Sequence, residues 1–137
     1  MKGFLKGLLA LIVGFAVGSA VNMGLVMLGG QLIAPPPGVD TSTTEGLKAA
    51  MPLFGPRHFL MPFLAHALGT LAGAFVATWV AGRTNRIPAL LVGVLFLAGG
   101  MAAAYMLPAP LWFEVADLLL AYLPCAWLGF VLARKRP

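Results

Sequence analysis

The chain has 137 residues, of which 61% are hydrophobic and 9% are charged, and it carries a net charge of +5. Soluble domains are about 45–50% apolar and about 25% charged, so this composition indicates an integral membrane protein. The basic residues stand at the ends of apolar segments, where they set orientation in a membrane, so the positive charge does not indicate a nucleic-acid partner. Four spans of about 20 residues use most of the length, which leaves a single domain over residues 1–137 and no room for a soluble one.

The first apolar run extends over residues 8–33, and its length allows a tilted helix to cross the bilayer. Within it, Gly14 and Gly18 fall close to one helical face together with Asn22. Small residues on one face let a second helix approach closely, so we predict a helix–helix contact at these glycines. Asn22 either adds an interhelical hydrogen bond there or contacts a ligand.

A proline-rich loop over residues 34–59 follows the first span. Three consecutive prolines near its start fix an extended backbone. Ser42 and Glu45 then have the spacing of a capping box, which predicts a short helix ended by Pro52. We expect this helix on the outer side of the membrane, where it lies on the surface or folds over the mouth of the bundle, and a plain surface loop is the alternative.

The second span, residues 59–81, carries the clearest indication of a site. His66 and Thr70 lie one helical turn apart, and Gly69 and Gly73 share their side of the helix. An ionisable side chain at membrane depth is costly, so His66 is by default a functional-site candidate whose partner has to be found. The two glycines form a GxxxG pair, which predicts a close contact with another helix.

Two more apolar runs, residues 88–107 and 111–133, predict the third and fourth spans. The third span contains no charge, and we expect it to act as scaffold with Gly100 on its close-packing face. The fourth span contains two acidic residues. Glu114 lies within a turn of the boundary, where water or a ligand can reach it, whereas Asp117 lies deeper.

Pro124 disturbs the hydrogen bonding of the fourth span. A proline inside a helix has no N–H of its own, and it leaves the carbonyl four residues earlier, that of Leu120, without its usual partner. We therefore predict a kink in the fourth helix, which either opens a cavity beside Cys125 or is filled by packing. The sequence does not place the hydroxyl of Tyr122.

The distribution of basic residues predicts the orientation of the bundle. Two of them, Lys48 and Arg57, fall at one side of the predicted spans and seven fall at the other. The seven are Lys2, Lys6, Arg83, Arg86, Arg134, Lys135 and Arg136. Cytoplasmic segments carry an excess of positive charge, so we expect both termini in the cytoplasm and the proline-rich loop outside. The predicted fold is an all-α four-helix transmembrane bundle of up-down topology.

His66 and Asp117 are predicted to meet across the second and fourth spans. At about 1.5 Å per residue, both lie roughly 8–10 Å below the outer boundary. Asn22 and Thr70 can reach the same layer or the next turn. A carboxylate in a medium of low dielectric constant is stabilised by an adjacent imidazole that shares a proton with it. The pair is either a functional polar site, in a cavity reached from outside beneath the loop, or a tie between two helices.

His58, His66 and Asp117 are the candidate ligands if a metal binds. The sequence has none of the HxxxH, ExxH or CxxC spacings that hold transition metals. Its single cysteine, Cys125, cannot form an internal disulfide. We therefore predict neither a metal nor an organic cofactor.

Three stretches of the chain resemble a group of small uncharacterised bacterial inner-membrane proteins with four helices. They are PPPGVD at residues 35–40, AHALGTLAGAF at residues 65–75 and PAPLWFEVADLLLAYLP at residues 108–124. The resemblance implies a location in the bacterial inner membrane, and it implies no activity. Four spans are also typical of fluoride channels and small multidrug transporters, but the sequence lacks the motifs of both families.

Two functions from different classes fit these features. The first is a small transporter or channel-like protein that uses His66 and Asp117 as a polar site, open to the outer side and able to couple to protons. The second is a structural or accessory membrane subunit, homo-oligomeric or bound to another chain, in which the pair only ties two helices. An intramembrane enzyme acting on lipid is a third class, and the sequence carries no motif of one. The expected partners are the lipid bilayer and a small solute or ion.

Overall fold

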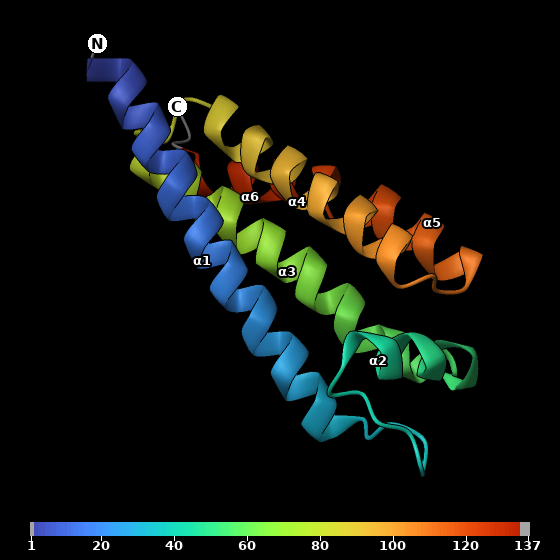
Figure 1. The fold of residues 1–137 in the computed structure, drawn as a ribbon. Helices are drawn as coiled ribbons and strands as arrows, with labels where there is room; N and C mark the ends of the chain where they lie inside the picture. Colours follow the sequence, from blue (N-terminus) through green and yellow to red (C-terminus); the bar gives the residue numbers. More distant parts are fainter. Residues whose placement is uncertain (1, 135–137) are drawn as a thin grey trace.

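The computed structural model describes residues 2–134, which form a bundle of helices (Figure 1). The helices are α1 (Lys2–Leu32), α2 (Thr44–Ala50), the 3-10 helix η1 (Met51–Leu53), α3 (Pro56–Val80), α4 (Ile87–Met106), α5 (Leu111–Leu120) and α6 (Leu123–Ala133). No strand occurs within the described residues. Four segments are long and apolar enough to cross a membrane: α1, α3, α4, and α5 taken together with α6. The chain is therefore an all-helical, multi-pass membrane protein, as its composition predicts.

Helix α3 lies at the centre of the bundle, because it packs against α1, α4, α5 and α6. Most of its buried residues are small, among them Ala65, Ala74 and Ala77. Small side chains let neighbouring helices approach from several directions at once. Helix α1 packs along α3 and also touches α4, while large apolar side chains on its other sides remain exposed. These exposed side chains supply the surface that a bilayer would cover.

Two glycine pairs join α1 to α3. An ideal Cβ atom at Gly14 would lie 2.6 Å from the carbonyl oxygen of Gly73, and one at Gly73 would lie 2.7 Å from that of Gly14. At the second pair, a Cβ atom at Gly18 would lie 2.7 Å from the carbonyl oxygen of Gly69. Gly14 of α1 faces Gly73 of α3, and the later Gly18 faces the earlier Gly69, so these two helices run antiparallel. A side chain at any of the four positions would separate the two backbones.

The fourth span is broken into two helices, which corrects the expectation of a kink at Pro124. Helix α5 ends at Leu120 and α6 begins at Leu123, so residues 121–122 form a turn within the span. Pro124 falls in the first turn of α6, where a missing N–H has no intrahelical partner to lose. The Leu120 carbonyl accepts a hydrogen bond from the Cys125 thiol at 3.3 Å. A proline ring clashes with the carbonyl four residues earlier, and the chain avoids this by ending one helix and starting another.

The loop after α1 folds into α2 and η1, as the sequence predicts, but the cap lies one residue later than expected. The Thr43 hydroxyl oxygen accepts a hydrogen bond from the Gly46 amide at 3.0 Å. Ser42 instead donates its amide and its hydroxyl to Oδ1 of Asp40, at 2.9 and 2.6 Å. These two bonds hold the pKa of the Asp40 carboxyl below its usual value. The carboxylate therefore stays ionised at neutral pH and fixes the turn that leads into α2.

The turn between α3 and α4 is tied to the end of α6. Gly82 has a φ of +100°, which glycine adopts without strain at the end of a helix. Arg83 donates from Nε to the carbonyl oxygen of Ala133 at 2.8 Å. The ammonium nitrogen of Lys6 lies beside Gly82, 3.0 Å from the position of an ideal Cβ atom. The start of α1 and the ends of α3 and α6 therefore share one end of the bundle, away from α2 (Figure 1).

Candidate functional site

Three side chains form one hydrogen-bonded cluster between α3 and the fourth span. His66 Nδ1 lies 2.9 Å from both carboxylate oxygens of Asp117. The Tyr122 hydroxyl donates to Asp117 Oδ2 at 2.8 Å and lies 3.0 Å from His66 Nδ1. Asp117 is only 5% exposed. The predicted contact between His66 and Asp117 is therefore confirmed as a hydrogen-bonded pair inside the bundle, with Tyr122 as a third member.

Tyr122 joins the cluster because the helix is broken beside it. In a continuous α-helix, residues five positions apart point in different directions, since each residue turns the chain by about 100°. Tyr122 has φ −110° and ψ −84°, which are not helical values. This turn directs the hydroxyl back toward Asp117. The signal in the sequence that could have located it is Pro124, which disturbs the helical hydrogen bonds close to Tyr122.

Helix α4 holds the ring of Tyr122 in place. Residue Tyr122 is only 1% exposed. A Cβ atom at Gly100 would overlap its hydroxyl and its ring. The sequence predicts Gly100 as a residue of a helix-packing face. The structure places it against a side chain of the cluster, so this glycine leaves space for the ring that supports Asp117.

Gly100→Ala is expected to lower the free energy of unfolding by about 1–3 kcal/mol, the usual cost of overpacking, because the Tyr122 ring has to leave its position. Gly99→Ala is the matched control, since an ideal Cβ atom at Gly99 has nothing within 4 Å. Unfolding in detergent measures both variants. In a Tyr122→Ala background the ring is gone, so Gly100→Ala should then cost little. Equal stabilities of Gly99→Ala and Gly100→Ala would contradict this placement of Tyr122.

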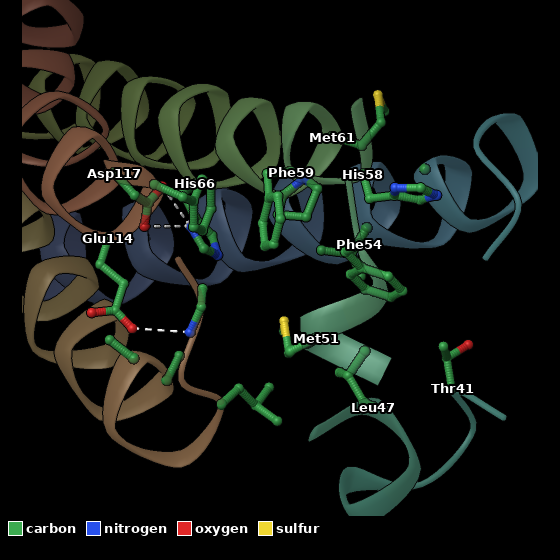
Figure 2. A pocket seen from close by; sticks show the side chains of 18 of the residues that line it. Thr41, Leu47, Met51, Phe54, His58, Phe59, Met61, His66, Glu114 and Asp117 are labelled. Atoms are coloured by element: carbon green, nitrogen blue, oxygen red, sulfur yellow. Dashed lines mark hydrogen bonds and ion pairs between the residues drawn. The ribbon is translucent and has the colours of Figure 1, made fainter. Parts of the chain in front are cut away.

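Two members of the cluster, His66 and Asp117, form part of the wall of a cavity of about 370 Å³ (Figure 2). The cavity lies beneath the loop that follows α1, where the sequence predicts one. His66 and Asp117 stand at one end of it in Figure 2, and Phe54 stands toward the other. Leu47 of α2 and Met51 of η1 close one side. The cavity therefore joins the buried pair to the segment that covers this end of the bundle.

Helices α2 and η1 cover the cavity without packing closely on the rest of the fold. No Cα atom of either helix lies within 8 Å of a Cα atom in α1, α3, α4, α5 or α6. Leu47 and Met51 of the covering segment face the cavity. The backbone of this cover is therefore less closely packed on the spans than the spans are on one another. Segments with few close backbone contacts open at low free energy.

Glu114 lines the same cavity, one helical turn before Asp117 on α5. Its Oε1 accepts a hydrogen bond from the Ala109 amide at 3.0 Å. Its Oε2 has no hydrogen-bond partner among the described residues. Glu114 therefore has one carboxylate oxygen without a hydrogen-bond partner among the described residues, and Figure 2 shows its side chain toward the end of the cavity that holds His66.

His58 lines the cavity away from the buried pair, as Figure 2 shows. Its Nδ1 accepts a hydrogen bond from the Gly55 amide at 3.0 Å, and its ring stacks on Phe54 with centroids 4.9 Å apart. Within residues 2–134, no three His, Cys, Asp or Glu side chains converge as metal ligands would. The structure thus brings His66 and Asp117 together but does not add His58 to them.

Asn22 and Thr70 stay outside the cavity. Neither residue is part of its lining. Thr70 is fully buried, and its hydroxyl oxygen and the Asn22 side-chain oxygen find no hydrogen-bond partner in the described part of the chain. An ideal Cβ atom at Gly69 would lie 2.9 Å from the Cβ atom of Asn22, so Asn22 belongs to the α1–α3 contact. The structure does not bring either residue into the hydrogen-bonded cluster.

Phe59 and Phe113 separate the cavity from a second hollow on the surface of α3 and α5. Both residues line the cavity and also line this hollow, which measures about 330 Å³. Their ring centroids lie 4.7 Å apart. The wall between the cavity and the apolar outer surface of the bundle is therefore aromatic and about one side chain thick at this point.

No protein-family model, curated protein or solved structure matches the chain. The resemblance to small bacterial inner-membrane proteins stays a prediction.

Proposed function

We propose that this protein is a small transporter or channel-like membrane protein in which the His66–Asp117 pair is the polar site of a solute pathway. The observation that carries this proposal is the cavity of about 370 Å³ with the pair in its wall and a loosely packed cover above it. An interhelical tie needs no such space, because a tie is most stable when packed on all sides. Binding cavities for small molecules commonly measure about 300–1,000 Å³.

The cluster is suited to couple solute movement to a proton. His66 and Asp117 share hydrogen bonds in a largely apolar setting, so their protonation states depend on one another. The titratable groups that surround His66 are Asp117 and Tyr122 in direct contact, and Glu114 and His58 elsewhere in the cavity wall. A solute that alters the charge balance among these groups would change where the proton resides. Buried ionisable residues of this kind form the proton relays of many transporters.

The inner half of the bundle is closed beneath the pair. Ala74, Ala89, Ala126 and Phe130 form a buried apolar cluster between the site and the end of the bundle that holds Lys6. The helix break at residues 121–122 lies between this cluster and Asp117. Discontinuous helices are frequent at transporter sites, because each half can move against its neighbours. A movement of α6 relative to α5 would open the inner side.

Both termini lie in the cytoplasm of a bacterial cell in this proposal, with the cavity opening to the outside through an up-down bundle. Seven basic residues against two support this orientation, although Lys135 and Arg136 lie outside the described residues. The contact of Lys6 with Gly82 and the bond from Arg83 to Ala133 gather basic residues at one end of the bundle.

Thiol labelling from each side of the membrane tests both the pathway and the orientation. Leu118→Cys in a Cys125→Ala background places a thiol in the cavity wall beside Asp117. We expect a membrane-impermeant thiol reagent to label it from either side of oriented vesicles, because a transporter exposes its site alternately. Thr44→Cys on the cover should react only from outside. Arg86→Cys, between α3 and α4, should react only from inside.

Leu119→Cys is the matched control, since Leu119 is next in sequence, is 66% exposed and does not line the cavity. Lipid should shield it from the reagent on both sides. Labelling of Leu118→Cys from one side only, or from neither, would contradict a pathway. Exchange of the labelling sides of Thr44→Cys and Arg86→Cys would reverse the orientation.

A structural or accessory subunit is the second candidate, and two observations favour it. The Asp117 carboxylate, His66 Nδ1 and the Tyr122 hydroxyl satisfy one another, as the members of a tie would. Helix α1 also has glycines with open space beside them, where a helix of a second copy or of another chain could pack. These glycines are Gly3, Gly7 and Gly24.

A further inference from the structure

We propose that the cavity binds a small apolar molecule that carries one protonated amine. This inference rests on the proposed function, because it assumes that the cavity receives a solute, and it names the chemical class of that solute. Three features of the cavity carry it: the sign of the charge in the wall, the hydrogen-bonding state of His66, and the aromatic side chains around the remaining space.

The wall carries negative charge, although the chain as a whole has a net charge of +5. Glu114 and Asp117 are its carboxylates, and no Lys or Arg is found among the described residues that line it. Asp117 is balanced by hydrogen bonds from His66 and Tyr122, whereas Glu114 receives one bond, from the Ala109 amide, on a single oxygen. A carboxylate that is only partly compensated at the edge of an apolar space attracts a cation and repels an anion.

His66 presents a hydrogen-bond acceptor to the cavity. An ionised carboxylate only accepts hydrogen bonds, so the Nδ1 atom of His66 must carry the hydrogen that it shares with Asp117. In the neutral imidazole, Nε2 then has a lone pair and no hydrogen. This atom has no hydrogen-bond partner among the described residues, and the ring is 24% exposed toward the cavity that it lines. An N–H group of a protonated amine is the complement of this lone pair.

Glu114 and His66 both line the cavity, and Figure 2 shows them toward the end that holds Asp117. Between them they offer a free carboxylate oxygen and an imidazole lone pair. Hydrogen bonds from an ammonium to a carboxylate are about twice as strong as bonds between neutral groups. An amine at this end would therefore be held more firmly than a hydroxyl of the same size.

The rest of the cavity suits an apolar body. Phe54, Phe59 and Phe113 line it, and Phe59 packs on Phe113 with ring centroids 4.7 Å apart. Aromatic faces attract cations as well as apolar groups, which favours an organic cation over a hydrated metal ion. His58 is the remaining titratable group of the wall, and it lies toward Phe54 with its Nδ1 bonded to the Gly55 amide. A molecule with an aromatic or alkyl body and an amine at one end therefore matches the wall along its length.

Calorimetric titration of the purified full chain in detergent tests this class with three probes of one shape. The probes are 4-phenylbutylamine, 4-phenyl-1-butanol and 4-phenylbutyrate, which are a cation, a neutral molecule and an anion at pH 7. We expect the amine to bind roughly tenfold or more tighter than the alcohol, as one additional charge-assisted hydrogen bond would give. We expect the carboxylate to bind most weakly. Titration into protein-free micelles corrects for partitioning of each probe into detergent.

Glu114→Gln should remove most of the preference for the amine while leaving the affinity for the alcohol unchanged. The glutamine oxygen can still accept from the Ala109 amide, so the fold around the site is retained. Glu45→Gln is the matched control, because it makes the same change in charge on an exposed residue of α2 that does not line the cavity. It should leave all three affinities as they are.

Each outcome of the titrations decides a different question. Tighter binding of the alcohol or of the carboxylate, or equal binding of all three probes, would overturn the amine class and leave the solute pathway standing. Equal effects of Glu114→Gln and Glu45→Gln would show that the preference does not arise in this cavity, and would overturn the inference. Absence of binding by every probe, together with one-sided or absent labelling of Leu118→Cys, would overturn the solute pathway as well.

Discussion

Gly73→Leu is expected to destabilise the bundle by about 1–3 kcal/mol, as overpacking of a tight contact does. An ideal Cβ atom at Gly73 would lie 2.7 Å from the carbonyl oxygen of Gly14 and 3.1 Å from Cγ1 of Val92. These atoms belong to α1 and α4, so a larger side chain meets a neighbour in two directions. The carbonyl is part of the α1 backbone and cannot rotate away. Helix α1 therefore has to move off α3 to make room.

Gly24→Leu is the control for this substitution. Gly24 lies on α1, and an ideal Cβ atom at this position has nothing within 4 Å. Unfolding in detergent or in lipid nanodiscs compares the two variants. Gly69→Leu should resemble Gly73→Leu, since a Cβ atom there would lie 2.9 Å from the Gly18 carbonyl oxygen. If both variants on α3 prove as stable as Gly24→Leu, then this face of α3 points to lipid and not to α1.

Asp117→Leu is expected to cost more stability than His66→Leu. Loss of the carboxylate takes away the acceptor that His66 Nδ1 and the Tyr122 hydroxyl share, and the Tyr122 hydroxyl is then a buried donor with only His66 Nδ1, 3.0 Å away, beside it. A stranded buried donor costs about 1–3 kcal/mol. Loss of the imidazole leaves Asp117 with the bond from Tyr122 and free to take up a proton, so the penalty is smaller than the about 3–5 kcal/mol of an isolated buried charge.

Asp117→Asn is the matched control, because its side-chain oxygen still accepts a hydrogen bond in nearly the same volume. The triple variant with Asp117→Leu, His66→Leu and Tyr122→Phe should recover part of the stability lost in Asp117→Leu, since no polar partner remains unsatisfied. Replacing a whole buried polar cluster by apolar groups is often nearly neutral. Chemical denaturation of these four variants and of Tyr122→Phe alone measures these differences, and a loss in the triple variant equal to the sum of the three single losses would contradict a shared network.

The same triple variant separates a transport site from a tie. If the cluster is a polar site, the variant keeps the fold and loses both amine binding and two-sided labelling of Leu118→Cys. If the cluster is only a tie, an apolar replacement that packs well keeps every activity of the protein. Both outcomes are read in a folded protein, so loss of stability cannot be mistaken for loss of function.

The membrane location and the number of spans follow from the sequence by itself. A bilayer requires about 20 apolar residues for each helical crossing, and that requirement is local to each segment. The positions of glycine on α1 and α3 were also informative for a local reason. Residues three and four apart share a helical face, so Gly69 and Gly73 mark a face before any neighbouring helix is known. The structure then supplies the neighbour, through Gly14 and Gly18.

The meeting of His66 with Asp117 was also predictable, because the helical rise of about 1.5 Å per residue gives each residue a depth in the membrane. Depth alone does not give the direction of a side chain around its helix. Asn22 and Thr70 lie at suitable depths, yet they do not line the cavity. The rotation of each helix depends on how all the packing surfaces fit together, and no single segment encodes it.

The tertiary structure determines the place of Tyr122 in the cluster, the contact of Gly100 with its ring and the cover of the cavity. Tyr122 reaches Asp117 only because the chain leaves the helix at residues 121–122, and its ring fits only because Gly100 of α4 has no side chain. The sequence indicates a disturbance at Pro124, but whether a helix bends or breaks depends on the partners available to the freed backbone and side chains. Those partners come from α3 and α4, which are distant in sequence. The sequence by itself therefore determines the spans and the depth of the polar residues. The packing of the helices against one another determines the site.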